Sequence, residues 1–216
     1  ALAGENSLED LDNADNAVQL RQNTVNVVTD GLLRDYEDRV ARAVTSGTNL
    51  GSYVALAGTN KWSNFVNSDP LSDVTTARAF IRQRTGLDAN TMVIDNDTAA
   101  VIRRHPALLE LYKYTSGGQI TMQQLKDAFD VQTILMGEGI KNMAKEGATA
   151  SIVNIWGNNV ILAHVEKAIS LQTATFGLSF RWTPSGIPVP MQVSRYNDPD
   201  PGKKVEVIET GYYQDE

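Results

Sequence analysis

Two carboxylates, Asp95 and Asp97, stand directly after a short apolar run at residues 92–94 and could do chemistry there. In open α/β sheets, ligands bind beyond the carboxyl ends of the strands, so these aspartates could hold a divalent metal in the manner of a nucleotide-sugar glycosyltransferase. The same residues also fit a helix cap, and the sequence nearby offers no further acidic or histidine ligand. We therefore favour the capping interpretation and keep an α/β glycosyltransferase as an alternative.

Other candidate catalytic groups are few. Gly137, Glu138 and Gly139 form half of a dinucleotide-binding fingerprint, but its third glycine is missing, so the segment predicts a loop. His164 lies in an apolar run and is interpreted as a core or interface histidine rather than a general base. His105 precedes a proline and is interpreted as a helix-end residue. Nucleophile-elbow, P-loop and HExxH motifs do not occur in the sequence, so we assign no catalytic, cofactor-binding or metal-binding residue.

The composition excludes several classes of site. The 216 residues include no cysteine and two histidines, which excludes disulfides, thiolate metal sites, cysteine nucleophiles and three-histidine metal centres. The net charge of −7 argues against a protein that holds nucleic acid along a basic groove, because such grooves cluster lysine and arginine. The apolar runs are shorter than the roughly 18 residues of a membrane helix. We expect a soluble chain of one medium domain or two interlocked ones that folds without a metal or cofactor.

A long helix is predicted at the start of the chain. Apolar residues recur at spacings of three and four over residues 14–46, which is the pattern of an amphipathic helix. Asp35 and Arg39 add an ion pair of the favoured acid-first orientation along it. Gly31, in the middle of the helix, predicts a bend or a close contact.

Helices and strands alternate in the middle of the sequence. Asp69 and a following proline begin a helix that Gly86 ends. Residues 92–94 predict a strand, followed by a helix that stops at His105, and Thr121 with Gln124 forms a capping box for the next helix.

Three further strands are predicted after that helix. They cover residues 134–136, 152–156 and 160–165, and a turn at residues 157–159 joins the last two. The last run is apolar on both faces, which is typical of a central strand. A mixed sheet flanked by helices fits this region.

The C-terminal part predicts long antiparallel strands. Phe176, Phe180 and Trp182 alternate with small or polar residues, which indicates a strand with one buried aromatic face. Two more strands, near residues 191–195 and 205–212, flank a dense turn signal at residues 197–202. Such strands would pack against the first helix, so we expect one domain to be built from both ends of the chain.

The order of these parts resembles that of major capsid proteins of tailed bacteriophages with the HK97-type fold. The segments that carry the resemblance are the helix opening with NAD, the turn KWSNF, the helix beginning at DP, TGLDANTMVIDNDTAAVIRRHP, ITMQQLKDAFDVQTILMGEGI, IWGNNVILAHV, FGLSFRW and SRYNDPDPGKKVEVIETGYY. They cover nearly the whole chain, and the specificity lies in their order.

The resemblance implies an α+β, HK97-like fold of two domains. A peripheral, or P, domain would comprise residues 1–68 and 175–216, with a spine helix over about 14–46 and C-terminal strands. An axial, or A, domain would comprise residues 69–174, with the mixed sheet and its helices. Residues 115–119 and 137–147 are polar and glycine-rich, and one or both would lie near the local symmetry axis of a capsomer. The candidate residues of the second loop are Gly137, Glu138, Gly139, Lys141 and Lys145.

The resemblance also implies a structural protein rather than an enzyme. Copies would associate as pentamers and hexamers, form an icosahedral shell and enclose phage DNA without sequence-specific binding. Scaffolding, portal or decoration proteins would be further partners, and the protein would reside in the virion capsid after assembly in the host cytoplasm. A bacterial encapsulin, a nanocompartment shell of the same fold, is the first alternative, and the glycosyltransferase using Asp95 and Asp97 is the second.

The chain has no initiator methionine and opens on a short acidic segment, so we expect it to be a fragment of a longer product. The resemblance implies that an N-terminal arm and a protruding E-loop precede the long helix and supply much of the contact between subunits. We accordingly expect these 216 residues to be folded but mainly monomeric in dilute solution.

Overall fold

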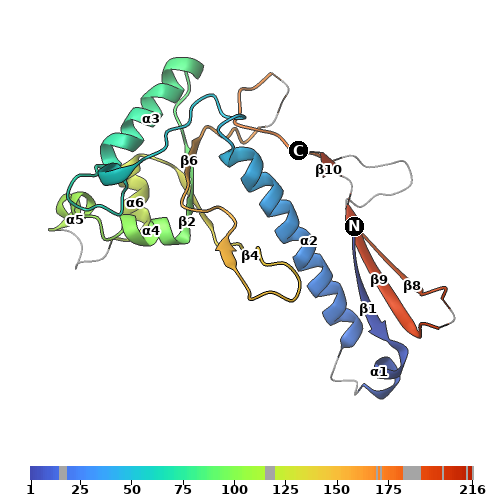
Figure 1. Cartoon of the computed structure of the whole chain (residues 1–216). Coiled ribbons are helices and arrows are strands. Elements are labelled where there is room, and N and C mark those ends of the chain that lie inside the picture. Colours follow the sequence, from blue (N-terminus) through green and yellow to red (C-terminus); the bar gives the residue numbers. More distant parts are fainter. Residues whose placement is uncertain are drawn as a thin grey trace. The chain divides into compact units, whose positions relative to one another are not determined.

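The computed structural model describes residues 1–14, 19–114, 120–168, 170, 172–181, 191–200, 202–212 and 214–215. The chain folds into two compact units, the first made of Ala1–Val40 with Leu178–Glu216 and the second of Ala41–Gly177 (Figure 1). Residues 41–68 and 175–177 thus group with the second unit, whereas the predicted division placed them in the P domain. The assignment of P and A domains to residues stays a prediction.

The first unit contains a three-stranded antiparallel sheet in the order β1-β9-β8. Strand β1 (Leu2–Ser7) pairs with β9 (Val205–Tyr212), which pairs with β8 (Met191–Asn197) (Figure 1). A short helix, α1 (Leu8–Asn13), follows β1, and a two-stranded pair joins β7 (Phe180–Arg181) to β10 (Gln214–Asp215). Both ends of the chain therefore contribute strands to the first unit.

Helix α2 (Leu20–Thr45) begins in the first unit and packs closely on β1 there. A Cβ atom at Gly4 would lie 2.6 Å from Cγ2 of Thr24 and 2.8 Å from Cγ2 of Val28. A Cβ atom at Gly31 would lie 2.9 Å from Cδ2 of Leu2. The predicted close contact at Gly31 is therefore confirmed, and glycines on both elements let the helix and strand approach.

Glu206 is a buried carboxylate that joins α2 to the sheet. Its side chain is 7% exposed and accepts a hydrogen bond from Nε of Arg21, at 2.7 Å, while Nε of Arg195 lies 3.5 Å from its other oxygen. The hydrogen bond to Glu206 raises the pKa of Arg21 above its usual value. Because a buried charge is costly without a partner, these contacts hold α2, β9 and β8 together.

The second unit contains the mixed sheet expected from the sequence. Strand β2 (Thr91–Asp95) lies in its middle, parallel to β3 (Thr133–Gly137) and antiparallel to β6 (Val160–Ala163). Met92 and Ile94 of β2 lie on the same face of the sheet and are fully buried in the core of the second unit. The core also contains Val74, Ala99, Ile102, Leu108, Ile120, Leu125, Phe129, Val131 and Ile134.

Four helices accompany this sheet, and their ends follow the sequence signals. They are α3 (Pro70–Thr85), α4 (Asn96–Ile102), α5 (Pro106–Tyr112) and α6 (Met122–Phe129), with a short 3-10 turn, η1 (Gly58–Asn60), before α3. Asp69 caps α3, and Gly86 ends it with a φ of 72°. The capping box of Thr121 and Gln124 is present at α6.

The predictions for the strands after β3 were partly wrong. Strands β5 (Ile152–Asn154) and β6 follow each other along the chain but join different sheets, because β5 pairs with β4 (Ile140–Asn142) and β6 pairs with β2. Within the described residues β6 is an edge strand, not a central one. It is apolar on both faces because Val160 and Leu162 pack against the core while Ile161 and Ala163 are buried as well.

The predicted aromatic strand was also wrong over its described residues. Only Phe180 and Arg181 are in a strand, and the side chains of Phe176 and Phe180 are 43% and 61% exposed. The alternation of residue types is present, but no layer covers this face within the described part of the chain. Trp182, residues 15–18 of the predicted first helix, and the loop at 115–119 lie outside the described residues.

Candidate functional site

The candidate capsomer loop at residues 137–147 includes the first strand of an ordered hairpin, in which β4 pairs with β5. Gly137 is buried at the end of β3, and a Cβ atom there would lie 2.4 Å from Cδ1 of Trp156. Glu138 and Gly139 lead into β4, in which Lys141 lies opposite Val153 of β5. The prediction of a loop over the whole segment therefore missed strand β4.

Hydrogen bonds within the hairpin fix its shape. The N–H of Ile155 donates to the carbonyl oxygen of Gly139 at 2.8 Å, and the N–H of Met143 donates to that of Ser151 at 2.8 Å. The side-chain oxygen of Asn142 accepts hydrogen bonds from the N–H groups of Ala144, at 3.0 Å, and Ser151, at 2.9 Å. These hydrogen bonds hold the turn between β4 and β5 in a defined conformation.

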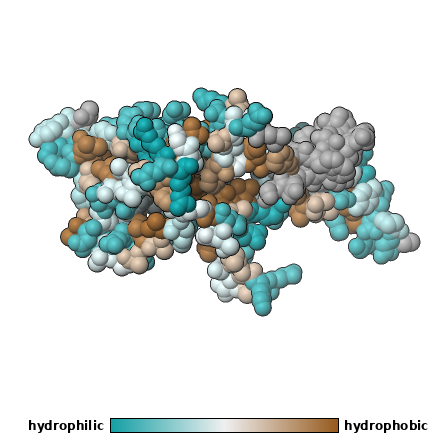
Figure 2. Space-filling view, turned by 90° about the horizontal axis from the view of Figure 1, so that it is seen from above, coloured by the Kyte–Doolittle hydropathy of each residue, from teal (hydrophilic) through white to brown (hydrophobic). Residues whose placement is uncertain are grey.

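Apolar side chains are exposed on the β4–β5 hairpin. Ile140 is 49% exposed, Met143 62% and Ile152 64%. Two acidic residues, Glu138 and Glu146, and two lysines, Lys141 and Lys145, accompany them. Exposed apolar residues that are grouped on one element can form part of a contact site between proteins. The space-filling view in Figure 2 shows that apolar residues reach the surface in several places among hydrophilic ones.

Asn154 anchors the hairpin to the end of the central strand. Its Nδ2 donates to Oδ2 of Asp97 at 2.8 Å and lies 3.4 Å from Oδ2 of Asp95. Asp95 is 1% exposed, and its Oδ2 also accepts the N–H of Asp97 at 3.1 Å, which caps α4. One amide thus connects β5 to the start of α4.

The two aspartates of the alternative metal site therefore serve as a cap and an anchor. The structure brings Asp95 and Asp97 together, as expected, but an asparagine amide lies between their carboxylates. Within the described residues, no group of three or more acidic or histidine side chains could hold a metal ion. A donor N–H is the wrong partner for a cation, so this arrangement favours helix capping over metal binding.

Both histidines contact backbone groups of the fold. Nδ1 of His164 lies 2.7 Å from the carbonyl oxygen of Asp88 and therefore carries the ring proton, since a carbonyl only accepts. Its Nε2 is 3.8 Å from Oε2 of Glu166, and the side chain is 18% exposed. His105 is the N-cap of α5 and is 1% exposed, which agrees with the prediction of a helix-end residue.

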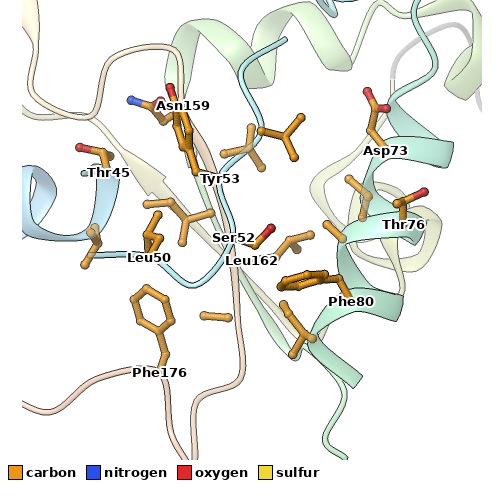
Figure 3. Close-up of a pocket in the computed structure, with 18 of the residues that line it drawn as sticks. Thr45, Leu50, Ser52, Tyr53, Asp73, Thr76, Phe80, Asn159, Leu162 and Phe176 are labelled. Atoms are coloured by element: carbon orange, nitrogen blue, oxygen red, sulfur yellow. The ribbon is translucent and has the colours of Figure 1, made fainter. Parts of the chain in front are cut away.

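A pocket of about 950 Å³ lies in the second unit, beside α3 and β6. Figure 3 shows Asp73, Thr76 and Phe80 on α3, Leu162 on β6, and Leu50 to Tyr53 on the connecting segment around it. Of its polar groups, Asp73 is engaged by Trp62, whose indole N–H donates to Oδ2 of Asp73 at 2.7 Å. The pocket is mainly apolar, and Asp97 and His164 are among the polar residues that line it.

Sequence reasoning missed the residues that position the hairpin. Asn154 and Trp156 stand in an apolar run that gave a strand signal only, and their partners Asp97 and Gly137 are distant in the sequence. The two glycines at 137 and 139 were the one local signal of an unusual packing site.

Over the described residues, the helices are too short or too polar to cross a membrane.

The chain is similar in sequence to two phage proteins. It is 29% identical over 181 residues to the major capsid protein of Pseudomonas phage JBD67, which covers 80% of this chain and 56% of that protein. It is 31% identical over 153 residues to the major capsid protein of Burkholderia phage BcepMu, which covers 70% of this chain and 48% of that protein. The chain thus spans about half the length of these relatives. No protein-family model matches it.

A solved structure has the same fold. The crystal structure of a phage-related protein from Bordetella bronchiseptica RB50 superimposes with a TM-score of 0.76, at 24% sequence identity, over 98% of this chain and 69% of that protein. The mixed α and β architecture agrees with the HK97-like capsid fold implied by the order of the sequence segments. The chain is therefore related to phage major capsid proteins in sequence.

Proposed function

We propose that this chain is the core of a phage major capsid protein, a structural protein whose copies assemble into the icosahedral shell around phage DNA. The observation that carries the proposal is the similarity to two phage major capsid proteins along 80% and 70% of the chain. The residues that could have served an enzyme support the same function, because Asp95, Asp97 and the two histidines act as caps and anchors. The protein would occupy the virion capsid after assembly in the host cytoplasm.

The test is assembly of the complete gene product that contains this chain. Expressed alone in bacteria and viewed by electron microscopy, it should form closed shells of uniform diameter, with pentamers and hexamers in the reconstruction. A product that stays monomeric over a wide range of salt and concentration, with or without the neighbouring phage genes, would overturn the proposal. Coexpression with those genes also tests portal, scaffolding and decoration proteins as partners.

An encapsulin shell is the second candidate, since it shares the fold. The names of the two sequence relatives favour the phage, because both are phage capsid proteins. Shells that package nuclease-protected DNA in the presence of a terminase and portal would support the phage capsid. Shells that instead capture a cargo enzyme from their own operon would support the encapsulin.

Within the capsid, the β4–β5 hairpin is the contact we assign to the local symmetry axis. Glu138, Gly139, Lys141 and Lys145 lie in or beside it, Gly137 ends the preceding strand β3, and its exposed apolar residues offer a surface for a neighbouring subunit. Residues 137–147 carry two lysines and two glutamates, so their charges balance. Reversing both lysines with K141E and K145E would leave four acidic groups, and several copies around one axis would then repel each other.

The double variant K141E/K145E should impair capsomer formation while the monomer stays folded. The matched control is K141R/K145R, which changes the side chains but keeps the charge. We expect the control to form shells of normal size and the charge-reversed variant to remain largely as free subunits, measured by sedimentation velocity. Normal shells from both variants would remove this hairpin from the axis without affecting the capsid proposal itself.

A further inference from the structure

His105 is a buried histidine at the corner between α4 and α5. Its Nδ1 accepts a hydrogen bond from the backbone N–H of Ala107 at 3.2 Å. Its Nε2 lies 3.0 Å from Oγ of Ser68, in the segment that precedes α3. The ring of Phe65 meets the imidazole edge-on, with 5.6 Å between the ring centroids. The histidine thus joins two segments that are far apart in the sequence.

These contacts fix where the ring proton is. Since Nδ1 accepts the N–H of Ala107, it carries no proton, and the proton of the neutral ring must be on Nε2. The Nε2–H group then donates to Oγ of Ser68, whose hydroxyl donates in turn to the carbonyl oxygen of Asn64 at 2.6 Å. Only the bond from Ala107 requires a neutral ring, because the Nε2–H group can donate to Ser68 in either charge state.

The segment held by His105 has a second, independent anchor. The indole N–H of Trp62 donates to Oδ2 of Asp73 on α3 at 2.7 Å. Between the two anchors, Val66 is 87% exposed and Phe65 is 43% exposed. Loss of the contact to His105 would therefore free residues 64–68 while Trp62 keeps the start of the segment in place.

Burial and one nearby charge act on the pKa of the His105 imidazole in opposite directions, and burial has the larger effect. The carboxylate of Asp69, the cap of α3, favours protonation, whereas burial lowers the pKa of His105 below its usual value of 6.5. The side chains that touch the ring from the held segment are uncharged. Of the two basic residues ending α4, Arg103 donates to the carbonyl oxygen of Ile120 and Arg104 is exposed.

We propose that His105 is an acid-operated latch, which opens the α4–α5 corner and releases residues 64–68 when Nδ1 takes up a proton. The added proton removes the acceptor for the N–H of Ala107, so that two donors face each other. It also charges a ring that is 1% exposed and covered by the uncharged Phe65 and Ser68, and this cost is relieved when residues 64–68 move away and admit water. The closed form excludes the proton, so it is stable above the ordinary histidine value of 6.5 and is lost as pH falls through the lowered pKa of the folded state. The latch lies within one subunit and does not depend on shell assembly.

Amide hydrogen exchange between pH 8 and pH 4.5 tests the latch, with each rate expressed as protection relative to the intrinsic rate at that pH. We expect protection at Ala107 and Ser68 to fall as pH decreases, by up to about tenfold per pH unit, because one proton is coupled to opening. The amides of β2, which is buried in the sheet, should keep their protection. Imidazole resonances followed by NMR should show His105 titrating over the same pH range.

The two histidines of the chain provide matched variants. In H105N, the asparagine oxygen can still cap α5 but cannot titrate, so protection at Ala107 should no longer depend on pH. In H164N, the pH dependence should remain. Constant protection in the wild type, the same loss in H105N, or its disappearance in H164N would overturn the latch. If H105N does not fold, a mismatch between the wild-type His105 titration and the loss of protection would overturn it as well.

Discussion

The indole of Trp156 occupies the space that a side chain at Gly137 would need. A Cβ atom at Gly137 would lie 2.4 Å from Cδ1 and 2.6 Å from Cγ of Trp156, well inside the contact distance of two carbon atoms. Gly137 is buried at the end of β3, so the indole closes the base of the β4–β5 hairpin against the sheet. A glycine is required at this position because any side chain would collide with the indole.

Gly137→Ala should therefore destabilise the second unit. An added methyl group that forces a packed indole to move costs about 1–3 kcal/mol. Urea unfolding followed by tryptophan fluorescence measures the change. Gly177→Ala is the matched control, because a Cβ atom there meets nothing within 4 Å and its φ lies outside the left-handed region. We expect that control to stay within about 0.5 kcal/mol of the wild type, and equal losses in both variants would contradict the role of Trp156.

Asn154→Ala should loosen the hairpin from the sheet. The change removes the amide that donates to Asp97 and approaches Asp95, and leaves a buried carboxylate with one partner fewer. We expect a loss of about 1–2 kcal/mol in the free energy of unfolding and faster amide exchange in β4 and β5. Asn158→Ala, at an exposed position of the following turn, is the control and should change neither quantity. Unchanged exchange in Asn154→Ala would show that the indole contact alone holds the hairpin.

Removal of metal ions should not affect folding. Asp95 and Asp97 are engaged by an amide and by a backbone N–H, and the described residues hold no cluster of metal ligands. Thermal unfolding with and without EDTA should give the same midpoint. A midpoint that falls by more than a few degrees in EDTA, and returns with a divalent ion, would revive the metal site of the glycosyltransferase alternative.

Helix ends could be predicted from the sequence because their determinants are local. Asp69, Gly86 and the pair Thr121 and Gln124 act on backbone groups within four residues of themselves, so their spacing is enough. The central strand β2 was predictable for a similar reason, since its apolar run is bounded by a capping aspartate.

Strand partners could not be predicted in the same way. Strand β4 has three residues and is defined by pairing with β5, whose sequence signal was a longer strand leading to a hairpin with β6. The alternation at Phe176 and Phe180 correctly describes residue types, but it carries no information on which layer would cover the aromatic face. The pairing of strands and the burial of a sheet face both depend on residues that are distant in the chain. The same holds for Asn154 and Trp156 of the candidate site, whose partners Asp97 and Gly137 are distant in the sequence.

Glu206→Gln should destabilise the first unit more than the loss of an exposed acid does. The variant keeps the size of the side chain but leaves Arg21 and Arg195 without the buried carboxylate that pairs with both. We expect the thermal midpoint of the chain to fall by several degrees, because the amide remains buried while the ion pairs are lost.

Asp35→Asn is the matched control for this change. Asp35 is 63% exposed and pairs with Arg39 one turn along α2, at 3.2 Å, in a surface ion pair that solvent screens. Its removal should shift the midpoint by less than about one degree. Scanning calorimetry at low and high salt separates the two cases: the effect of Glu206→Gln should persist in high salt, since the carboxylate is only 7% exposed. Equal shifts in the two variants would mean that Glu206 is no more than another surface acid.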